Sequence, residues 1–325
     1  MPRQARLDAP GALHHIMIRG INKTIIFAGE KDKQVFLERL GLLVLEGHCA
    51  IYAWALMDNH VHLLFRSGKR GISDIMRKLL TWYAQYYNRT HQRSGHLFEN
   101  RYKSILCDEE EYLLALVRYI HLNPVRAGII TKLEDLVHYP WTGHQCIMDK
   151  ETCSWMDTEV VLARFGEKRR KAINEYHKFM AEGMDLGHVP ELTGGGLIRS
   201  LGGWSQVLSQ RRKGETVETD ERILGNGNFV SAIMKESEEQ QMRQLKLHRI
   251  GTTIHQITEE ECGRRNISVA ELKHGSRRSA VSAARMTIAF RCKDELGLPA
   301  AEIARYLGVN TSSITRAIVR KEQVN

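Results

Sequence analysis

Hydrophobic residues in the first third of the chain recur with two different periods. Alternating or short apolar runs predict four strands, at Leu13–Ile18, His48–Met57, His60–Arg66 and Leu97–Leu106. Apolar residues at helical spacing predict three helices, at Lys31–Glu46, Ile72–Tyr87 and Asp108–Asn123. The order β-α-β-β-α-β-α predicts an α+β fold with a ferredoxin-like antiparallel sheet.

The pattern changes beyond the seventh element. Glu159–Gly183 is predicted to be helical, with an interruption near Gly166. The glycines Gly194–Gly196 and Gly202–Gly203 are not followed by a GxxxxGK[ST] motif, so we interpret them as hinge or packing residues rather than a phosphate loop. From Thr258 onward the sequence predicts an all-helical, arginine-rich region.

The length of 325 residues exceeds one typical domain of roughly 100–200 residues. We expect three domains, at residues 1–150, 151–255 and 256–325, with the middle one acting as a helical connector. A net charge of +9 and an isoelectric point near 9.3 favour a polyanionic partner such as nucleic acid, although a solvated basic surface needs no such partner.

No apolar run approaches the roughly 18 residues of a membrane span, and the start of the chain lacks the apolar core of a secretion signal. The cysteines form no CxxC motif and are far apart, which argues against a zinc site or a disulfide scaffold. They also suit a reducing compartment. We therefore expect a soluble, cytoplasmic protein without a membrane partner. The six cysteines are Cys49, Cys107, Cys146, Cys153, Cys262 and Cys292.

The clearest chemical signal is the segment Met57–Leu64, MDNHVHLL. On a strand, side chains alternate between faces, so His60 and His62 project together while Val61 and Leu63 point into the core. Two imidazoles on one face can share a metal ion or bind an anion. The alternative is two histidines that simply face solvent on a half-buried strand.

The predicted helix at residues 109–123 offers partners for these histidines. Tyr119 and Asn123 are i and i+4 neighbours at one edge of its apolar stripe, and Pro124 places Asn123 at the helix end. A tyrosine in such a position usually lies at the rim of a core, and Tyr112 occupies the same edge.

These residue types suit phosphodiester chemistry. A divalent ion held by His60, His62 and the Asn123 carbonyl would neutralise the charge of a DNA phosphate and orient it. Nitrogen and oxygen ligands with open positions suit Mg²⁺ or Mn²⁺, although imidazole also binds Ni²⁺, Co²⁺ or Zn²⁺. The phenol of Tyr119 could then attack phosphorus, and the covalent link would retain the bond energy, so that rejoining needs no ATP.

Three motifs in order resemble the HUH single-strand transposases, and specifically the REP-associated tyrosine transposases. They are MDNHVHLLF at residues 57–65, RSGHLFENRYK at 93–103 and YIHLNPVRAG at 119–128. The resemblance covers roughly residues 5–145. It implies that residues 1–150 form an HUH tyrosine transposase catalytic domain.

The resemblance also implies roles for single residues. His60 and His62 would bind metal and Tyr119 would be the nucleophile, which removes Tyr112 as a candidate. Insertion-sequence relatives have a Gln one helical turn after the tyrosine, where this chain has the shorter Asn123. Family members cut single-stranded DNA at the foot of hairpins, typically as homodimers, and leave a 5′-phosphotyrosine.

Basic residues near the second motif suit a folded DNA backbone, whose charge gives salt-dependent affinity. These are Arg89, Arg93, Arg101 and Lys103. Trp82, Tyr86 and Tyr87 could stack on unpaired bases, although their helical spacing also suits core positions.

The C-terminal end predicts a helix-turn-helix for duplex DNA. Ala300–Tyr306 and Thr311–Arg320 are the helices, and the second presents a polar face that includes Ser312, Thr315 and Arg316. Residues 258–322 resemble the DNA-binding domain of the replication initiator DnaA, through VAELK at 269–273, RRSAV at 277–281 and Ala284-Arg285. The initiator's Asp-His pair is replaced here by Asn310-Thr311. Arg277, Arg278 and Arg285 are expected to contact phosphates.

Two alternatives to a transposase remain open. One is a domesticated, non-catalytic DNA-binding regulator, although such a protein has no reason to keep His60, His62 and Tyr119. The other is an HUH replication or conjugation nickase. These commonly carry a helicase or a second tyrosine, and the sequence has no Walker motif.

Overall fold

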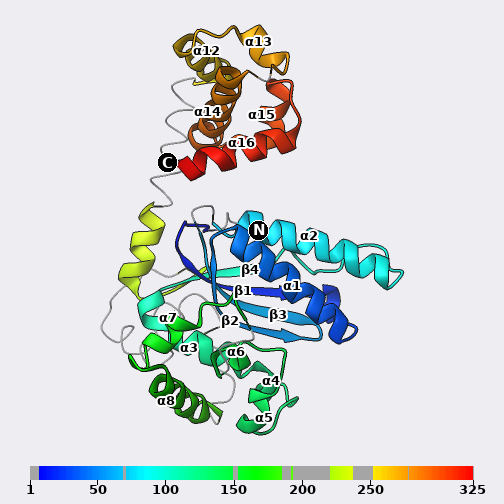
Figure 1. Ribbon diagram of the computed structural model, residues 1–325, viewed down its shortest axis with the longest axis vertical. Coiled ribbons are helices and arrows are strands. Elements are labelled where there is room, and N and C mark those ends of the chain that lie inside the picture. The colour runs from blue at the N-terminus through cyan, green and yellow to red at the C-terminus, as the bar shows by residue number, and fades with distance from the viewer. Residues whose placement is uncertain are drawn as a thin grey trace. The chain divides into compact units, whose positions relative to one another are not determined.

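The computed structural model describes residues 7–68, 71–148, 153–184, 192, 220–236, 252–276 and 278–324. The chain divides into two compact units (Figure 1), an N-terminal unit at Met1–Ser231 and a C-terminal unit at Ala232–Asn325. The glycine clusters at 194–196 and 202–203 lie outside the described residues. No helix within the described ranges has the length and apolarity needed to cross a membrane.

The N-terminal unit is built on a five-stranded sheet in the order β2-β3-β1-β4-β5. The first four strands pair antiparallel, which confirms the predicted α+β, ferredoxin-like arrangement. The fifth pairs parallel with β4 and makes the sheet mixed, a feature that the sequence pattern did not predict. The strands are β1 at Leu13–Arg19, β2 at Ala50–Met57, β3 at His60–Arg66, β4 at Lys103–Cys107 and β5 at Ile223–Leu224.

The fourth strand begins six residues later than the predicted start at Leu97. The preceding segment leaves the sheet ladder and crosses the end of β1, where Phe98 bridges to Gly20 and Ile21 donates its backbone N–H to Leu97. Glu99 likewise donates its backbone N–H to the carbonyl of Arg19. The arginine-rich motif at 93–103 is thereby fixed beside the end of β1.

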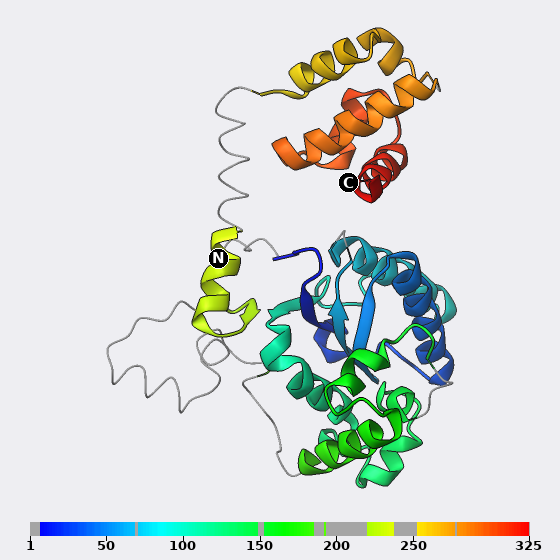
Figure 2. The same cartoon turned by 60° about the vertical axis from the view of Figure 1, so that its left-hand side comes forward.

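Three long helices cover the sheet (Figures 1 and 2). The helices α1, Glu30–Glu46, and α2, Ser73–Thr90, lie together on one face, and α3, Glu109–His121, lies on the other. Asp108 caps α3 by accepting a hydrogen bond from the Glu110 N–H, and three glutamates in its first turn favour the positive end of the helix dipole.

The end of α3 differs from the predicted one. The helix stops at His121, and a short helix, α4 at Asn123–Arg126, follows directly with Pro124 in its first turn. Proline is tolerated there because the first N–H groups of a helix have no partner within it. The chain therefore turns at Leu122 between the two helices, and this turn brings Arg126 back towards Tyr119.

The same hydrophobic core takes in the next four described helices, of which α7 and α8 lie past the domain boundary expected at residue 150. Val161, Leu162, Ala172, Tyr176 and Met180 are all buried in the core that packs against the sheet. Gly166, with a φ of +145°, interrupts the predicted helix as expected. The helices are α5 at Leu133–Val137, α6 at His144–Met148, α7 at Thr158–Ala163 and α8 at Arg169–Glu182.

The spacing of the cysteines argued against disulfide bonding, but one pair of cysteines is bonded. Cys146 and Cys153, seven residues apart, form a disulfide with Cα atoms 5.5 Å from each other. These two cysteines do not form a CxxC motif, so the motif search on the sequence did not point to this pair. Cys262 and Cys292 are buried thiols in the core of the C-terminal unit.

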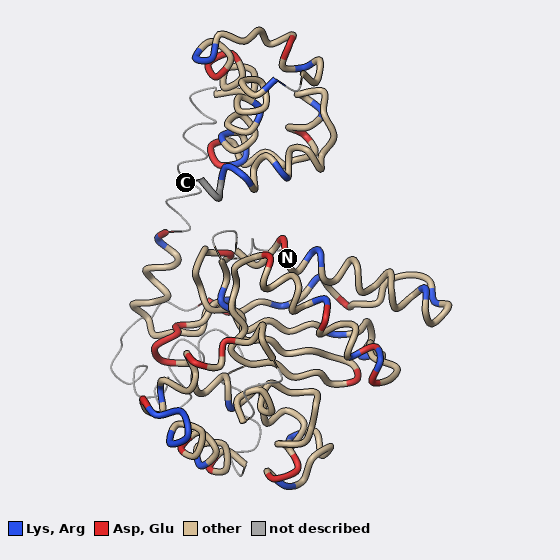
Figure 3. The backbone as a smooth tube through the Cα atoms, viewed as in Figure 1, with Lys and Arg blue, Asp and Glu red and all other residues tan. Residues whose placement is uncertain are grey.

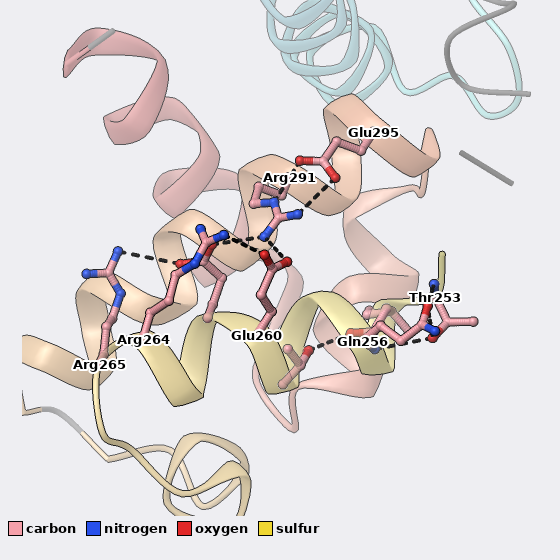
Figure 4. Close-up of polar contacts among 10 residues, drawn as sticks. Thr253, Gln256, Glu260, Arg264, Arg265, Arg291 and Glu295 are labelled. Carbon is pink, nitrogen blue, oxygen red and sulfur yellow. Dashed lines mark hydrogen bonds and ion pairs between the residues drawn. The ribbon is translucent and has the colours of Figure 1, made fainter. Parts of the chain in front are cut away.

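The C-terminal unit is all helical, with its own hydrophobic core. Buried Glu261 joins two helices of this unit, because it forms ion pairs with Arg264 on its own helix and with Arg291 on α14. Figure 4 shows that Arg291 also pairs with the neighbouring Glu260. Gly308, with a φ of +65°, sits in the predicted turn, where a Cβ would lie 2.7 Å from the Lys273 carbonyl. The helices are α12 at Ile254–Arg264, α13 at Val269–Lys273, α14 at Ser279–Leu296, α15 at Ala300–Tyr306 and α16 at Thr311–Val324.

Candidate active site

Strand β3 places His60 and His62 on one face, as the alternation predicted, with ring centroids 5.2 Å apart. Across the ladder to β1, His60 pairs with Arg19 and His62 with Met17. Opposite residues of an antiparallel pair project to the same side, so Arg19 belongs to this face as well. His62 is buried and His60 is half-buried.

A third imidazole joins them from β1. His15 is fully buried, and its Nε2 lies 2.9 Å from Nδ1 of His62. The two rings are stacked with centroids 5.2 Å apart. His15 could not be predicted from the sequence, because only the register of two strands puts these two rings, 47 positions apart in the chain, side by side.

Helix α3 lays Tyr119 over the same face. Its ring centroid is 5.9 Å from that of His15 and 5.9 Å from that of His62. The Arg126 guanidinium lies 4.9 Å from the Tyr119 ring and donates a 2.7 Å hydrogen bond to the Tyr119 carbonyl. His15, His60, His62 and Tyr119 together form what we call the site cluster.

Tyr112, the competing phenol, lies two helical turns earlier on α3. Burial, followed by the charge of Glu111, raises the pKa of Tyr112 well above its usual value of 10. This environment opposes ionisation and makes Tyr112 a poor nucleophile.

Asn123 is one turn beyond Tyr119, but its amide turns back onto the helix. Its Nδ2 donates to the carbonyls of Tyr119, at 3.0 Å, and Ile120, at 3.2 Å. This orientation leaves Oδ1 as the atom that could serve as a ligand. The role of Asn123 in metal binding remains a prediction.

Both strand histidines are neutral at neutral pH. Burial, reinforced by the charge of Arg19, lowers the pKa of His60 to about 4. Burial also lowers the pKa of His62 well below 6.5, with smaller effects from His15 and His60. Neutral imidazole is the form that binds a metal.

The geometry of this pair fits a shared divalent ion. With a metal–nitrogen distance of roughly 2.1 Å, and a ring centre about 1.2 Å from each nitrogen, two rings on one ion have centroids no more than about 6.6 Å apart. The observed 5.2 Å lies within this limit. Among the described residues no group of three or more His, Cys, Asp or Glu side chains is arranged to hold a metal. Amide, water and phosphate oxygens are further ligands of the kind that Mg²⁺ and Mn²⁺ accept.

The predicted DNA-contacting residues of the N-terminal unit differ in position. Lys103 on β4 pairs with Met17, which in turn pairs with His62, so Lys103 belongs to the face of the site cluster. Arg89 and Arg101 are exposed, and the Arg93 guanidinium lies 5.7 Å from the Tyr87 ring. Figure 3 shows the lysines and arginines along each unit.

The aromatic residues of α2 divide into two groups. Trp82 is 37% exposed and stacks on Tyr86, with centroids 5.9 Å apart. Tyr87 is 3% exposed and belongs to the core. Trp82 and Tyr86 thus keep a surface on which a base could stack, and Tyr87 does not.

In the C-terminal unit, Ser312 and Arg316 are exposed on α16, and Thr315 is half-buried. Arg278 forms an ion pair with Glu271 at 2.8 Å. Arg285 is turned inward, where it donates to the carbonyls of Leu272 and Ser276. Arg277 lies outside the described residues.

Three comparisons relate the chain to known proteins. The family model described as "Transposase IS200 like" matches residues 10–123, about a third of the chain. This segment contains His15, His60, His62, Tyr119 and Asn123. Among curated proteins no match was found.

A solved structure described as "Structure of the REP associates tyrosine transposase bound to a REP hairpin" is similar at 15% identity and a TM-score of 0.38. The similarity covers 49% of this chain and 93% of that one. We draw no conclusion from a similarity this low.

The structure adds four residues that sequence reasoning did not single out. His15, Arg19, Asn59 and Arg126 all touch or flank the predicted ligands and nucleophile. Asn59 lies in the motif at residues 57–65 and Arg126 in the motif at 119–128, so both could have been proposed as site residues from the sequence. His15 and Arg19 become visible only through the strand pairing.

Proposed function

We propose that the N-terminal unit cleaves and rejoins single-stranded DNA at hairpin-associated sites, with Tyr119 as the nucleophile. The observation that carries this proposal is the position of the Tyr119 ring, 5.9 Å from the His62 ring on the face that holds His60. The match of residues 10–123 to IS200-like transposases supports the same class of reaction.

In the proposed reaction, Tyr119 Oη attacks phosphorus of a backbone phosphodiester and forms an O–P bond. The bond from phosphorus to the 3′ oxygen breaks, and that oxygen leaves as a hydroxyl after taking a proton. The phenolic proton passes to solvent. Attack by a 3′ hydroxyl of another strand reverses these steps, so the 5′-phosphotyrosine conserves the energy needed for rejoining.

The cofactor of this proposal is Mg²⁺ or Mn²⁺, held by His60 and His62 with Asn123 as a third ligand. When bound, the ion would supply charge neutralisation at the scissile phosphate. Arg19 and Arg126 add positive charge close to His62. Such fixed charges favour the additional negative charge that develops during attack.

The DNA is held by contacts outside the site cluster. We assign backbone contacts to Arg89, Arg93, Arg101 and Lys103, with a DNA hairpin as substrate and a homodimer as the active form. The DnaA-like helix-turn-helix at residues 256–325 would bind duplex DNA through phosphate contacts by Arg277 and Arg278. Ser312, Thr315 and Arg316 would reach base edges. Because Arg285 is committed to two backbone carbonyls, it would act by holding α14 to α13 rather than by binding phosphate.

The test is cleavage of labelled, hairpin-flanked single-stranded DNA with Mn²⁺. Wild type is compared with Tyr119→Phe and His60→Ala. A denaturation-resistant protein–DNA adduct in wild type alone supports the proposal. Tight DNA binding without cleavage across a broad set of hairpins would instead favour a non-catalytic regulator. Cleavage that needs a helicase and no hairpin would favour a replication or conjugation nickase.

A further inference from the structure

Asn59 holds His60 through an amide whose orientation is fixed. Asn59 Nδ2 donates to the backbone carbonyl of Lys23 at 3.1 Å, so Oδ1 is the atom that faces His60. This oxygen lies 2.6 Å from His60 Nδ1. An amide oxygen can only accept a hydrogen bond, so Nδ1 of His60 must carry the proton. In a neutral ring, the form that binds a metal, the lone pair is then on Nε2.

His15 holds His62 in a comparable way. The contact joins His15 Nε2 and His62 Nδ1 at 2.9 Å, and both rings are buried. A hydrogen bond between two neutral rings contains one proton, which belongs to either His15 or His62. Only the arrangement with the proton on His62 Nδ1 leaves the lone pair on His62 Nε2.

We propose that Asn59 and His15 are positioning residues that set the tautomers of His60 and His62, so that both rings direct an Nε2 lone pair at one divalent ion. His15 then accepts from His62 and keeps its own proton on Nδ1. This inference rests on the proposed function, because it assigns that site its outer layer of hydrogen bonds. Partners of this kind commonly change metal affinity 10- to 100-fold when removed.

The arrangement has a chemical rationale. Free neutral histidine favours the proton on Nε2, which is the nitrogen that each ring here would need to keep unprotonated. Without an acceptor at Nδ1, each ring would revert towards that form and present an N–H to the ion. Two independent acceptors, an amide for His60 and an imidazole for His62, prevent this before the metal arrives.

The direct test is nitrogen-15 NMR of the full-length, metal-free protein labelled at histidine, at pH 7.5, with signals assigned through His60→Ala and His62→Ala. We expect both ring systems to show a protonated Nδ1 and an unprotonated Nε2. A proton on Nε2 of either ring in the wild type would overturn the proposal for that ring.

Matched variants separate positioning from packing. Asn59→Ala and His15→Leu remove the acceptors, whereas Asn59→Asp and His15→Gln keep an oxygen that can accept from Nδ1. We expect Mn²⁺ affinity, followed by the electron paramagnetic resonance of the free ion, to fall about 10- to 100-fold in the first pair and to recover largely in the second. Unchanged affinity and tautomers in the first pair would contradict the proposal, as would equal losses in both pairs.

The tautomer and Mn²⁺-affinity measurements test the positioning role separately from DNA cleavage. If the tautomers and Mn²⁺ affinities follow the expectation while no hairpin DNA is cleaved, the proposed reaction fails and the positioning role stands. If cleavage occurs and the tautomers are reversed, the proposed reaction stands and the positioning role fails. If circular dichroism shows that Asn59→Ala or His15→Leu is unfolded, the positioning role is still tested by the wild-type tautomers. The Mn²⁺ affinities of Asn59→Asp and His15→Gln test it as well.

Discussion

Helix α3 contributes to two clusters of imidazole and phenol groups that meet solvent differently. The site cluster includes Tyr119, and its His60 is half-buried. The second, which we call the core cluster, is fully buried, with both Nδ1 atoms of its histidines bound to one phenol at 2.9 and 2.8 Å. The core cluster consists of His121, His144 and Tyr176.

The two phenols, Tyr176 and Tyr119, differ in the groups that they contact. Tyr176 is held by His121 from α3 and His144 from α6, so its hydroxyl ties three helices together. Tyr119 lies beside Arg126 and faces the histidines of the sheet. Histidine and tyrosine therefore stabilise the fold in the fully buried core cluster. In our proposal they perform chemistry in the site cluster, where His60 is half-buried.

The largest expected effect separates the two phenols by activity. Tyr119→Phe should reduce DNA cleavage on the order of 10³-fold or more, because it removes the attacking oxygen. Tyr176→Phe should leave cleavage within a few-fold of wild type under native conditions. Adduct formation on denaturing gels measures both variants. Comparable activity losses in the two would show that Tyr119 has no special role.

The second effect concerns stability, where Tyr176→Phe should be the more harmful of the two substitutions. Tyr176→Phe should lower the free energy of unfolding by about 2–3 kcal/mol, because two buried imidazole nitrogens lose their partner. Tyr119→Phe, the same chemical change on the other cluster, should cost about 1 kcal/mol, the usual net contribution of a single hydrogen bond. Urea unfolding of both variants measures the difference. Equal stabilities would mean that the Tyr176 hydrogen bonds add nothing to the core.

How much of this contrast the sequence could predict depends on the range of each interaction. His60 and His62 follow from strand alternation, and β3 was predicted with its correct ends because a turn dipeptide and a local period define it. Tyr119 stood out from Tyr112 only through the family resemblance, since both occupy one helix edge. Such local signals say nothing about which phenol is enclosed.

Interactions between distant segments could not be predicted. The pairing of His15 with His62 depends on the register of two strands, and the binding of Tyr176 by His121 depends on how α8 packs. Strand β5 joins the sheet from more than a hundred residues downstream. Short-range periodicity does not determine any of these contacts.

The third effect concerns pH. Burial, followed by the charge of His177, lowers the pKa of His144 to about 3, while an unfolded histidine titrates near 6.5. The unfolded chain therefore binds more protons between pH 6.5 and about 3, so this histidine makes stability fall as pH decreases through that window. His144→Gln should give a shallower decline between pH 6.5 and 4 in urea unfolding. His60→Gln should flatten the decline only down to about pH 4, where the pKa of His60 lies, whereas the effect of His144→Gln should continue to about pH 3. An unchanged slope in His144→Gln would show that His144 does not titrate as its burial requires.

The smallest effect tests whether positive charge matters only near the site cluster. Lys103 belongs to the same sheet face as His62, whereas Lys178 lies on α8, which carries Tyr176, in an ion pair with Glu175 at 2.9 Å. Lys103→Ala should weaken hairpin DNA binding a few-fold and reduce the salt dependence of log Kd by about one phosphate contact. Lys178→Ala should change neither quantity, because its charge is already partly compensated and lies on the element of the core cluster. Fluorescence anisotropy at several salt concentrations measures both variants. Identical salt slopes in Lys103→Ala and wild type would place the DNA backbone away from this face, and the site cluster would then need another route to its phosphate.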